Sequence, residues 1–143
     1  MLIQDQAVVT TADQARLREM IDSLRASLPA SGEPYGSYLR ALEERLVQMS
    51  TVAEDEVDDD VVTMNSKVCV QDVATDQRQS LTLVYASDAD PFGEKVSVLT
   101  SLGAAVLGSR VGEVVEWQTR RHRRRMRIER IVFQPEAAGQ FDL

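Results

Sequence analysis

Apolar residues recur with two different spacings along this chain. In the first third they recur every three to four residues, and further along they recur at every second residue. In the first part, apolar side chains recur at helical spacing with charged residues between them: Leu17, Met20, Ile21, Leu24 and Leu28. Thr11 and Gln14 precede this run in the pattern of a capping box, in which a hydroxyl accepts from an early helical N–H. Pro29 disfavours continuation beyond Leu28. The pattern predicts a first helix, whereas residues 1–9 are too short to classify.

A second helical pattern runs from about Tyr35 or Ser37 to near Val52. Its apolar positions alternate spacings of four and three residues, as in the seam of a coiled coil: Tyr35, Leu39, Leu42, Leu46, Met49 and Ala53. A short loop containing Pro, Gly and Ser joins the two patterns. We therefore expect an antiparallel pair of helices of about 18 residues, each roughly 27 Å long. Because the pair has too little apolar surface for a core of its own, we expect it to project.

Residues 54–60 (EDEVDDD) are almost all acidic, and their mutual repulsion favours a solvated linker over a metal site. Beyond them, alternating apolar residues predict strands around positions 67–73, 81–85, 96–99, 114–117 and 126–133. A short helix, capped by Thr100 or Ser101 and stopped by Gly108, follows the third strand. The expected fold class is α+β: a helical hairpin at 1–53, an acidic linker at 54–62, and at 63–143 an antiparallel sheet of four or five strands with one short helix.

Composition narrows the classes of function. No apolar run approaches the roughly 20 residues of a membrane span, and the first residues lack a secretory signal pattern, so we expect a cytoplasmic protein without membrane contact. A single cysteine, Cys69, excludes an internal disulfide and a multi-cysteine metal site. The net charge is −7, yet positive charge is concentrated between Arg120 and Arg130. Such asymmetry suggests parts that face different environments.

The strongest cluster of positive charge is expected at the tip of the last hairpin, residues 119–124. Its candidate binding residues are Arg120, Arg121, Arg123, Arg124 and Arg125. They could contact nucleic-acid phosphates, form an ordinary solvated hairpin end, or dock against an acidic protein surface. No aromatic residues stand between them to stack on bases, and we favour docking. His122 has no second His or paired Cys nearby, so no metal role is expected.

Four segments carry a resemblance to a known family: VVTMNSKV (61–68), LTLVYASDADP (81–91), VSVLTSLGAAVLGSRVGEVVEW (96–117) and IVFQPEAAGQFD (131–142). They resemble the Gre family of bacterial transcription factors, and within it the branch named for regulation of nucleoside diphosphate kinase (Rnk). The resemblance implies an FKBP-like C-terminal domain behind an N-terminal coiled coil. It also implies binding to core RNA polymerase at its secondary channel, with the coiled coil pointing inward and the arginines docking on the polymerase exterior.

The tip of the hairpin departs from the family's cleavage-stimulating members, which carry a pair of acids that help to hold a magnesium ion in the polymerase. Here the tip residues are Ser31, Gly32, Glu33 and Tyr35, with Glu33 as the one acid. A single carboxylate supports an octahedral magnesium site less well than a pair does. The resemblance thus implies a competitor of other Gre-type factors that is not itself an enzyme, uses no cofactor and does not stimulate robust transcript cleavage. Glu33 offers at most a weak metal contact.

Two alternatives remain open on the sequence. The first is a true cleavage-stimulating factor in which Glu33 and polymerase residues suffice. The second is an indirect regulator of nucleoside diphosphate kinase; the chain contains no phosphate-binding loop of the form GxxxxGK[ST] for a direct nucleotide role. Homodimerisation through residues 11–53 and a weak nucleic-acid contact also remain open. The family's Ser-Pro at the start of the short helix is replaced by Thr100-Ser101, which affects only the preorganisation of that helix.

Overall fold

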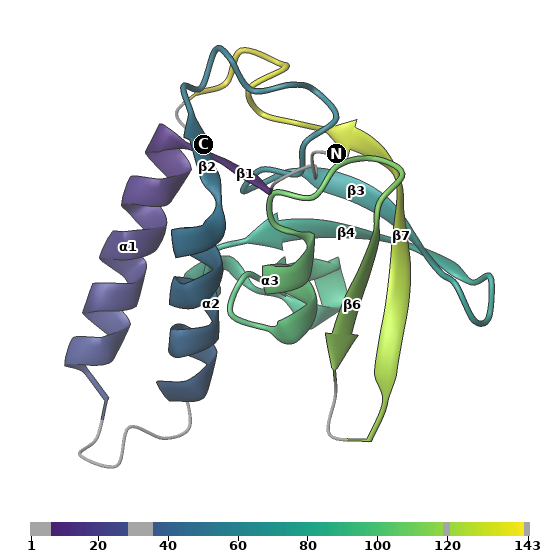
Figure 1. The fold of residues 1–143 in the computed structure, drawn as a ribbon, viewed down its shortest axis with the longest axis horizontal. Helices are drawn as coiled ribbons and strands as arrows, with labels where there is room; N and C mark the ends of the chain where they lie inside the picture. The colour runs from purple at the N-terminus through teal and green to yellow at the C-terminus, as the bar shows by residue number, and fades with distance from the viewer. Residues whose placement is uncertain (1–6, 29–35, 119–120, 142–143) are drawn as a thin grey trace.

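The computed structural model describes residues 7–28, 36–118 and 121–141, and within them the chain forms a mixed α+β fold (Figure 1). A pair of helices lies along one side, and a third, short helix lies between this pair and a curled sheet. In chain order the elements are β1 (Val8–Thr10), α1 (Thr11–Ala26), α2 (Gly36–Gln48), β2 (Ser50–Val52), β3 (Lys67–Asp72), β4 (Arg78–Val84), the 3-10 turns η1 (Ala86–Asp88) and η2 (Pro91–Gly93), β5 (Lys95–Ser97), α3 (Ser101–Val106), β6 (Val114–Gln118) and β7 (Arg123–Phe133).

The two predicted helices are present and antiparallel, but their ends differ from the prediction. The capping residue of α1 is Thr10, whose hydroxyl accepts from the Asp13 backbone N–H at 3.1 Å, whereas Thr11 donates to the Val52 carbonyl at 3.2 Å. The second helix ends at Gln48, four residues earlier than expected. Residues 50–52 instead form β2, which pairs in parallel with β1 and closes the base of the helical pair.

The five-stranded sheet has the order β5-β4-β3-β7-β6. The strands predicted around 67–73 and 81–85 are present as β3 and β4, which form an antiparallel hairpin with Asp76 of its turn in a left-handed conformation (φ 62°). The sheet is not antiparallel throughout, because β5 runs parallel to β4. The connection between these strands, through η1 and η2, brings the chain back far enough for Lys95 to pair with Thr82, so that β5 runs beside the last three residues of β4.

The short helix α3 has the predicted signals at both ends. The Thr100 hydroxyl accepts from the Gly103 N–H at 3.0 Å, and Gly108 follows the helix with a φ of 77°. Gly103 is buried against the preceding strand, where any Cβ would clash with the carbonyl oxygen of Ser97. A glycine is therefore required for α3 to lie this close to β5.

One hydrophobic core joins the helical pair to the sheet. The buried cluster contains seam residues of both helices together with residues of α3 and the inner face of the sheet: Leu17, Ile21, Leu39, Leu42, Leu46, Val68, Leu81, Leu83, Val106 and Ile128. Arg45 of α2 adds hydrogen bonds to the carbonyls of Ala105 (3.2 Å) and Leu107 (2.6 Å). The expectation that the pair projects from the rest is therefore wrong, because its apolar face is buried on the sheet side.

Self-association through residues 11–53 stays a prediction: the seam residues of the described helices are buried in this core, whereas Tyr38 and Val47 of α2 are exposed. The division of the chain at 1–53, 54–62 and 63–143, and the coiled-coil and FKBP-like descriptions, stay predictions. In the part of the chain that the structure describes, every helix is too short or too polar to cross a membrane.

The acidic segment 54–60 makes specific contacts with both of its neighbours. The Glu54 carboxylate accepts from the Ala12 N–H at 2.6 Å, in the first turn of α1. Further along, Asp58 and Asp60 form ion pairs of 3.1 Å and 2.9 Å with Arg110. These contacts tie the segment to the helical pair at one end and to the turn before β6 at the other.

Candidate functional site

The basic residues near the end of the chain lie mostly on a strand and not at a hairpin tip. β7 begins at Arg123, so Arg123, Arg124 and Arg125 pair with Gln118, Trp117 and Glu116 of β6. Arg121 lies in the exposed turn between the strands. The predicted tip of residues 119–124 is therefore too long, because the alternation of β6 continues into a regular ladder. Arg120 lies outside the described residues.

Strand alternation divides these arginines between the two faces of the sheet. Arg124 shares the face of Trp117, where its guanidinium lies 3.7 Å from the Asp72 carboxylate. Arg123 and Arg125 point to the opposite face, on which Arg123 lies 3.9 Å from Glu116. All three side chains are exposed. Consecutive arginines on one strand thus present positive charge in two directions and cannot all contact one flat partner.

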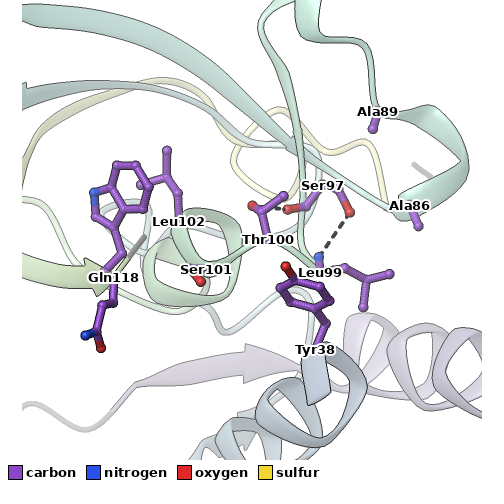
Figure 2. Close-up of a pocket in the computed structure, with 10 residues that line it drawn as sticks. Tyr38, Ala86, Ala89, Ser97, Leu99, Thr100, Ser101, Leu102 and Gln118 are labelled. Carbon is purple, nitrogen blue, oxygen red and sulfur yellow. Dashed lines mark hydrogen bonds between the residues drawn. The ribbon is translucent and has the colours of Figure 1, made fainter. Parts of the chain in front are cut away.

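A largely apolar groove of about 610 Å³ lies between α2 and the N-terminal end of α3 (Figure 2). Its apolar lining comes from four parts of the chain: Tyr38 on α2, Ala86 and Ala89 at η1, Leu99 and Leu102 around the start of α3, and Trp117 on β6. Tyr38 is 47% exposed and reaches over the segment that begins α3. Two hydrogen bonds to Ser97 fix that segment, from the Leu99 N–H (3.0 Å) and from the Thr100 hydroxyl (2.7 Å). The groove is therefore a preformed apolar surface with hydroxyl groups at its edge.

This groove was not predicted from the sequence. Tyr38 stands outside the predicted seam of the second helix, between the seam positions Tyr35 and Leu39. The position of Tyr38, an aromatic residue outside the seam of an amphipathic helix, could have indicated the groove, because such a side chain needs another apolar surface to contact. The partner surface comes from residues some 60 positions later and carries no pattern of its own.

Behind the groove, the indole N–H of Trp117 is buried and has no hydrogen-bond partner among the described residues. The same holds for Nε of Arg45, and both residues line a second hollow of about 570 Å³ between α2, α3 and β6. Burial lowers the pKa of Arg45, while Glu113 opposes that effect. The place where α2 meets the sheet therefore contains two buried N–H groups, on Trp117 and Arg45, without a hydrogen-bond acceptor among the described residues.

A buried carboxylate, Asp13, connects the base of the helical pair to the sheet. It is 3% exposed and accepts hydrogen bonds from the Met64 N–H (3.0 Å) and the Tyr85 hydroxyl (3.4 Å). Burial raises its pKa to about 6; Glu136 adds to the rise, whereas Arg16 and the two hydrogen bonds oppose it. Burial also raises the pKa of Tyr85. Because its hydrogen-bond donors come from the segment before β3 and from Tyr85 after β4, this carboxylate acts as a structural joint between α1 and the sheet.

The predicted polymerase-contact residues of the hairpin tip, Ser31, Gly32, Glu33 and Tyr35, lie outside the described residues. Within the described ranges, no three His, Cys, Asp or Glu side chains are grouped so that they could hold a metal ion. What the described structure brings together is the apolar groove, the base of the helical pair and a sheet that is basic along β7.

Comparison with known proteins identifies the family of this chain. The model of the family "Transcription elongation factor, GreA/GreB, C-term" matches residues 57–132, which include α3 and all of the five-stranded sheet except Phe133, the last residue of β7. The chain belongs to this family. The Regulator of nucleoside diphosphate kinase of Escherichia coli (strain K12) is 33% identical over 127 residues, covering 86% of this chain and 89% of that relative.

Other members of the family match a shorter stretch. Transcription elongation factor GreA of Clostridium acetobutylicum is 33% identical over 75 residues, 52% of this chain and 48% of its own length. Among solved structures, a GreA/GreB transcription elongation factor from Nitrosomonas europaea superposes with a TM-score of 0.68 at 30% identity, over 90% of this chain and 98% of that one. The chain is thus a Gre-family transcription factor of the Rnk type, as the sequence resemblance predicted.

Proposed function

We propose that this Gre-family factor binds core RNA polymerase, inserts its helical pair into the secondary channel, and competes there with other Gre-type factors without stimulating robust transcript cleavage. The observation that carries the proposal is the segment joining α1 to α2, PASGEPY (29–35), in which Glu33 is the one acid. A magnesium ion shared with a polymerase needs several oxygen ligands in near-octahedral geometry, and one carboxylate contributes less than a pair.

The dimensions and anchoring of the helical pair support this role. With 16 residues in α1 and 13 in α2, the arms are roughly 24 Å and 20 Å long. Asp13 connects the base of the pair to the segment before β3, and Arg45 connects α2 to the end of α3, so the orientation of the pair is set before any partner is met. A pair held in this way loses less conformational entropy on binding, which supports occupation of a channel by the end that carries residues 29–35.

Docking of the sheet against the polymerase exterior is proposed to use two neighbouring features. Arg123 and Arg125, which share one face, would meet an acidic surface together with Arg120 and Arg121 and speed the encounter, while Arg124 would contact the partner from the face of Trp117. The groove around Tyr38 and Trp117 would take an apolar side chain of the partner, since binding energy is concentrated where aromatic anchors are desolvated. The protein supplies no catalytic group and no cofactor in this proposal.

The decisive experiment combines competition with cleavage in stalled elongation complexes. The protein is expected to displace a labelled cleavage-stimulating Gre factor while leaving the stalled transcript at its original length. Glu33→Ala should leave competition unchanged, and Glu44→Ala, an exposed acid on α2, serves as the matched control. If the protein shortened the transcript at the rate of a cleavage factor, and Glu33→Ala abolished this activity, the cleavage-stimulating alternative would be correct.

A second experiment tests the docking residues. Arg123→Glu with Arg125→Glu should weaken binding to core polymerase, and the weakening should diminish as salt screens the charges. Capture from a bacterial lysate that recovers a nucleoside diphosphate kinase in place of polymerase subunits would support the kinase-regulator alternative and contradict the proposal.

A further inference from the structure

The outer face of the sheet, opposite the core, carries a row of basic side chains. Alternation along β3 buries Val68 and Val70 and turns Lys67, Cys69 and Gln71 outward. The strand pairing places Lys67 beside Phe133, Cys69 beside Arg130 and Gln71 beside Arg127, and it places Glu116 beside Arg125. Directly paired residues share a face of a sheet. We call Lys67, Arg125, Arg127 and Arg130 the outer basic row.

The charges of this row are not neutralised within the described part of the chain. Three other basic residues near it have acidic partners: Arg123 with Glu116, Arg124 with Asp72, and Arg78 with Glu129. No acidic group lies within ion-pair distance of the four residues of the row among the residues described, and all four are exposed. The whole chain has a net charge of −7, whereas the outer basic row is positively charged and has no acidic partner among the described residues. This contrast points to an anionic binding partner for the row.

The chemistry of the face favours phosphate over an acidic protein surface. Three of the four cations are arginines, whose planar guanidinium groups bind phosphate in a bidentate manner. Around them lie the small polar side chains Ser80 and Thr82 of β4. A protein interface needs an apolar centre that water leaves on binding, and this face offers only scattered apolar side chains.

Duplex nucleic acid fits the row better than a single strand does. Among the described residues, the exposed aromatic side chains are Tyr38, Phe92 and Phe141, and none of them lies on the five strands; Phe133, beside Lys67, is half-buried. Without an exposed aromatic platform, unpaired bases gain no stacking energy on this face. A duplex carries about one phosphate charge per 1.7 Å of its axis, so a surface that contacts only phosphates gains most from a duplex.

We propose that the outer basic row binds the phosphate backbone of double-stranded DNA without reading its sequence. This surface is separate from the helical pair and from the groove. It shares Arg125 with the arginines proposed to dock on polymerase, and its binding of DNA does not depend on insertion into the polymerase channel. With four phosphate contacts, the logarithm of affinity should fall with the logarithm of salt concentration with a slope of about −3.6. Affinity should therefore drop about a hundredfold between 50 and 200 mM salt.

Fluorescence anisotropy of the full chain with two labelled duplexes of unrelated sequence tests the proposal. Both duplexes should bind with similar affinity and with this salt slope. Arg127→Glu with Arg130→Glu should weaken binding at least tenfold and reduce the slope by about two. Arg18→Glu with Arg40→Glu changes the net charge equally on exposed positions of α1 and α2, and should cause a clearly smaller loss.

Several results would overturn the inference. These are absence of duplex binding at 50 mM salt, equal losses in the two double variants, or tighter binding of a single strand of the same length. Loss of polymerase binding in Arg127→Glu with Arg130→Glu, without loss of DNA binding, would assign the face to a protein partner. If the glutamate variants fail to fold, Arg127→Gln with Arg130→Gln removes the charge and retains polar side chains; unchanged DNA binding by that folded variant would equally refute the proposal.

Discussion

Replacement of Asp13 by asparagine should remove a specific part of the pH dependence of folding. The pKa of this buried carboxyl is raised from 3.8 to about 6, first because burial excludes water and then because Glu136 lies nearby. A rise of roughly two units corresponds to about 3 kcal/mol between the protonated and ionised forms. The folded chain binds this proton more tightly than the unfolded chain does, so wild-type stability falls as pH rises from about 4 to about 6.

The sign of the effect is opposite to that of a salt-bridged carboxylate. Below pH 3.8 the group is protonated in both states, and above pH 6 it is ionised in both, so the loss is complete by neutral pH. The asparagine side chain stays neutral at every pH and can still accept from the Met64 N–H. The stability of Asp13→Asn relative to wild type should therefore increase by about 3 kcal/mol over the whole window, with about half of that increase between pH 5 and pH 7.5.

Urea unfolding of both proteins at pH 5.0 and pH 7.5 measures this difference, and comparison of the two proteins cancels the titration of every other group. Asp22→Asn, which removes the same charge at an exposed position of α1, is the matched control variant. A stability difference between Asp13→Asn and wild type that is the same at both pH values would refute the reasoning. Asp13→Ala should be less stable than Asp13→Asn, because the Met64 N–H loses its acceptor.

The remaining predictions concern the packing that joins the helical pair to the sheet. Leu42→Ala, at a fully buried position, should cost about 2–5 kcal/mol of unfolding free energy in urea. Gly103→Ala should cost at least about 2 kcal/mol because the methyl group meets the Ser97 carbonyl, whereas Gly36→Ala, with open space around it, should be neutral or stabilising by thermal melting. Arg45→Met should lower stability by about 1–3 kcal/mol, since two carbonyls of α3 and its C-cap lose a charged donor.

Elements whose limits are specified by neighbouring residues could be predicted from the sequence. The hairpin of β3 and β4 combines alternation with a turn, and α3 combines a Thr100 cap with Gly108 at its end. In each case the signal lies within a few residues of the structure that it specifies, and the prediction needs no knowledge of the rest of the chain.

Elements that depend on distant partners could not be predicted in the same way. β1 and β2 have three residues each and pair across about 40 positions, so neither has a pattern long enough to identify. For the same reason α2 ends earlier than its sequence pattern predicts: residues 50–52 pair with β1 as a strand, and this pairing outweighs their helical pattern. The groove likewise needs Tyr38 and Trp117 to meet from opposite halves of the chain.

Because the helical pair and the sheet share one hydrophobic core, the function of the pair cannot be tested by deleting it. Leu39, Leu42 and Leu46 are almost completely buried against the same cluster as the inner face of the sheet. Removal of residues 11–53 would expose that cluster and leave the sheet without part of its core, so loss of polymerase binding in such a deletion would follow from unfolding alone. Substitution of Glu33 changes one charge in the loop and leaves these packed leucines intact. The chemistry of the tip can therefore be separated from the fold only by changes confined to residues 29–35.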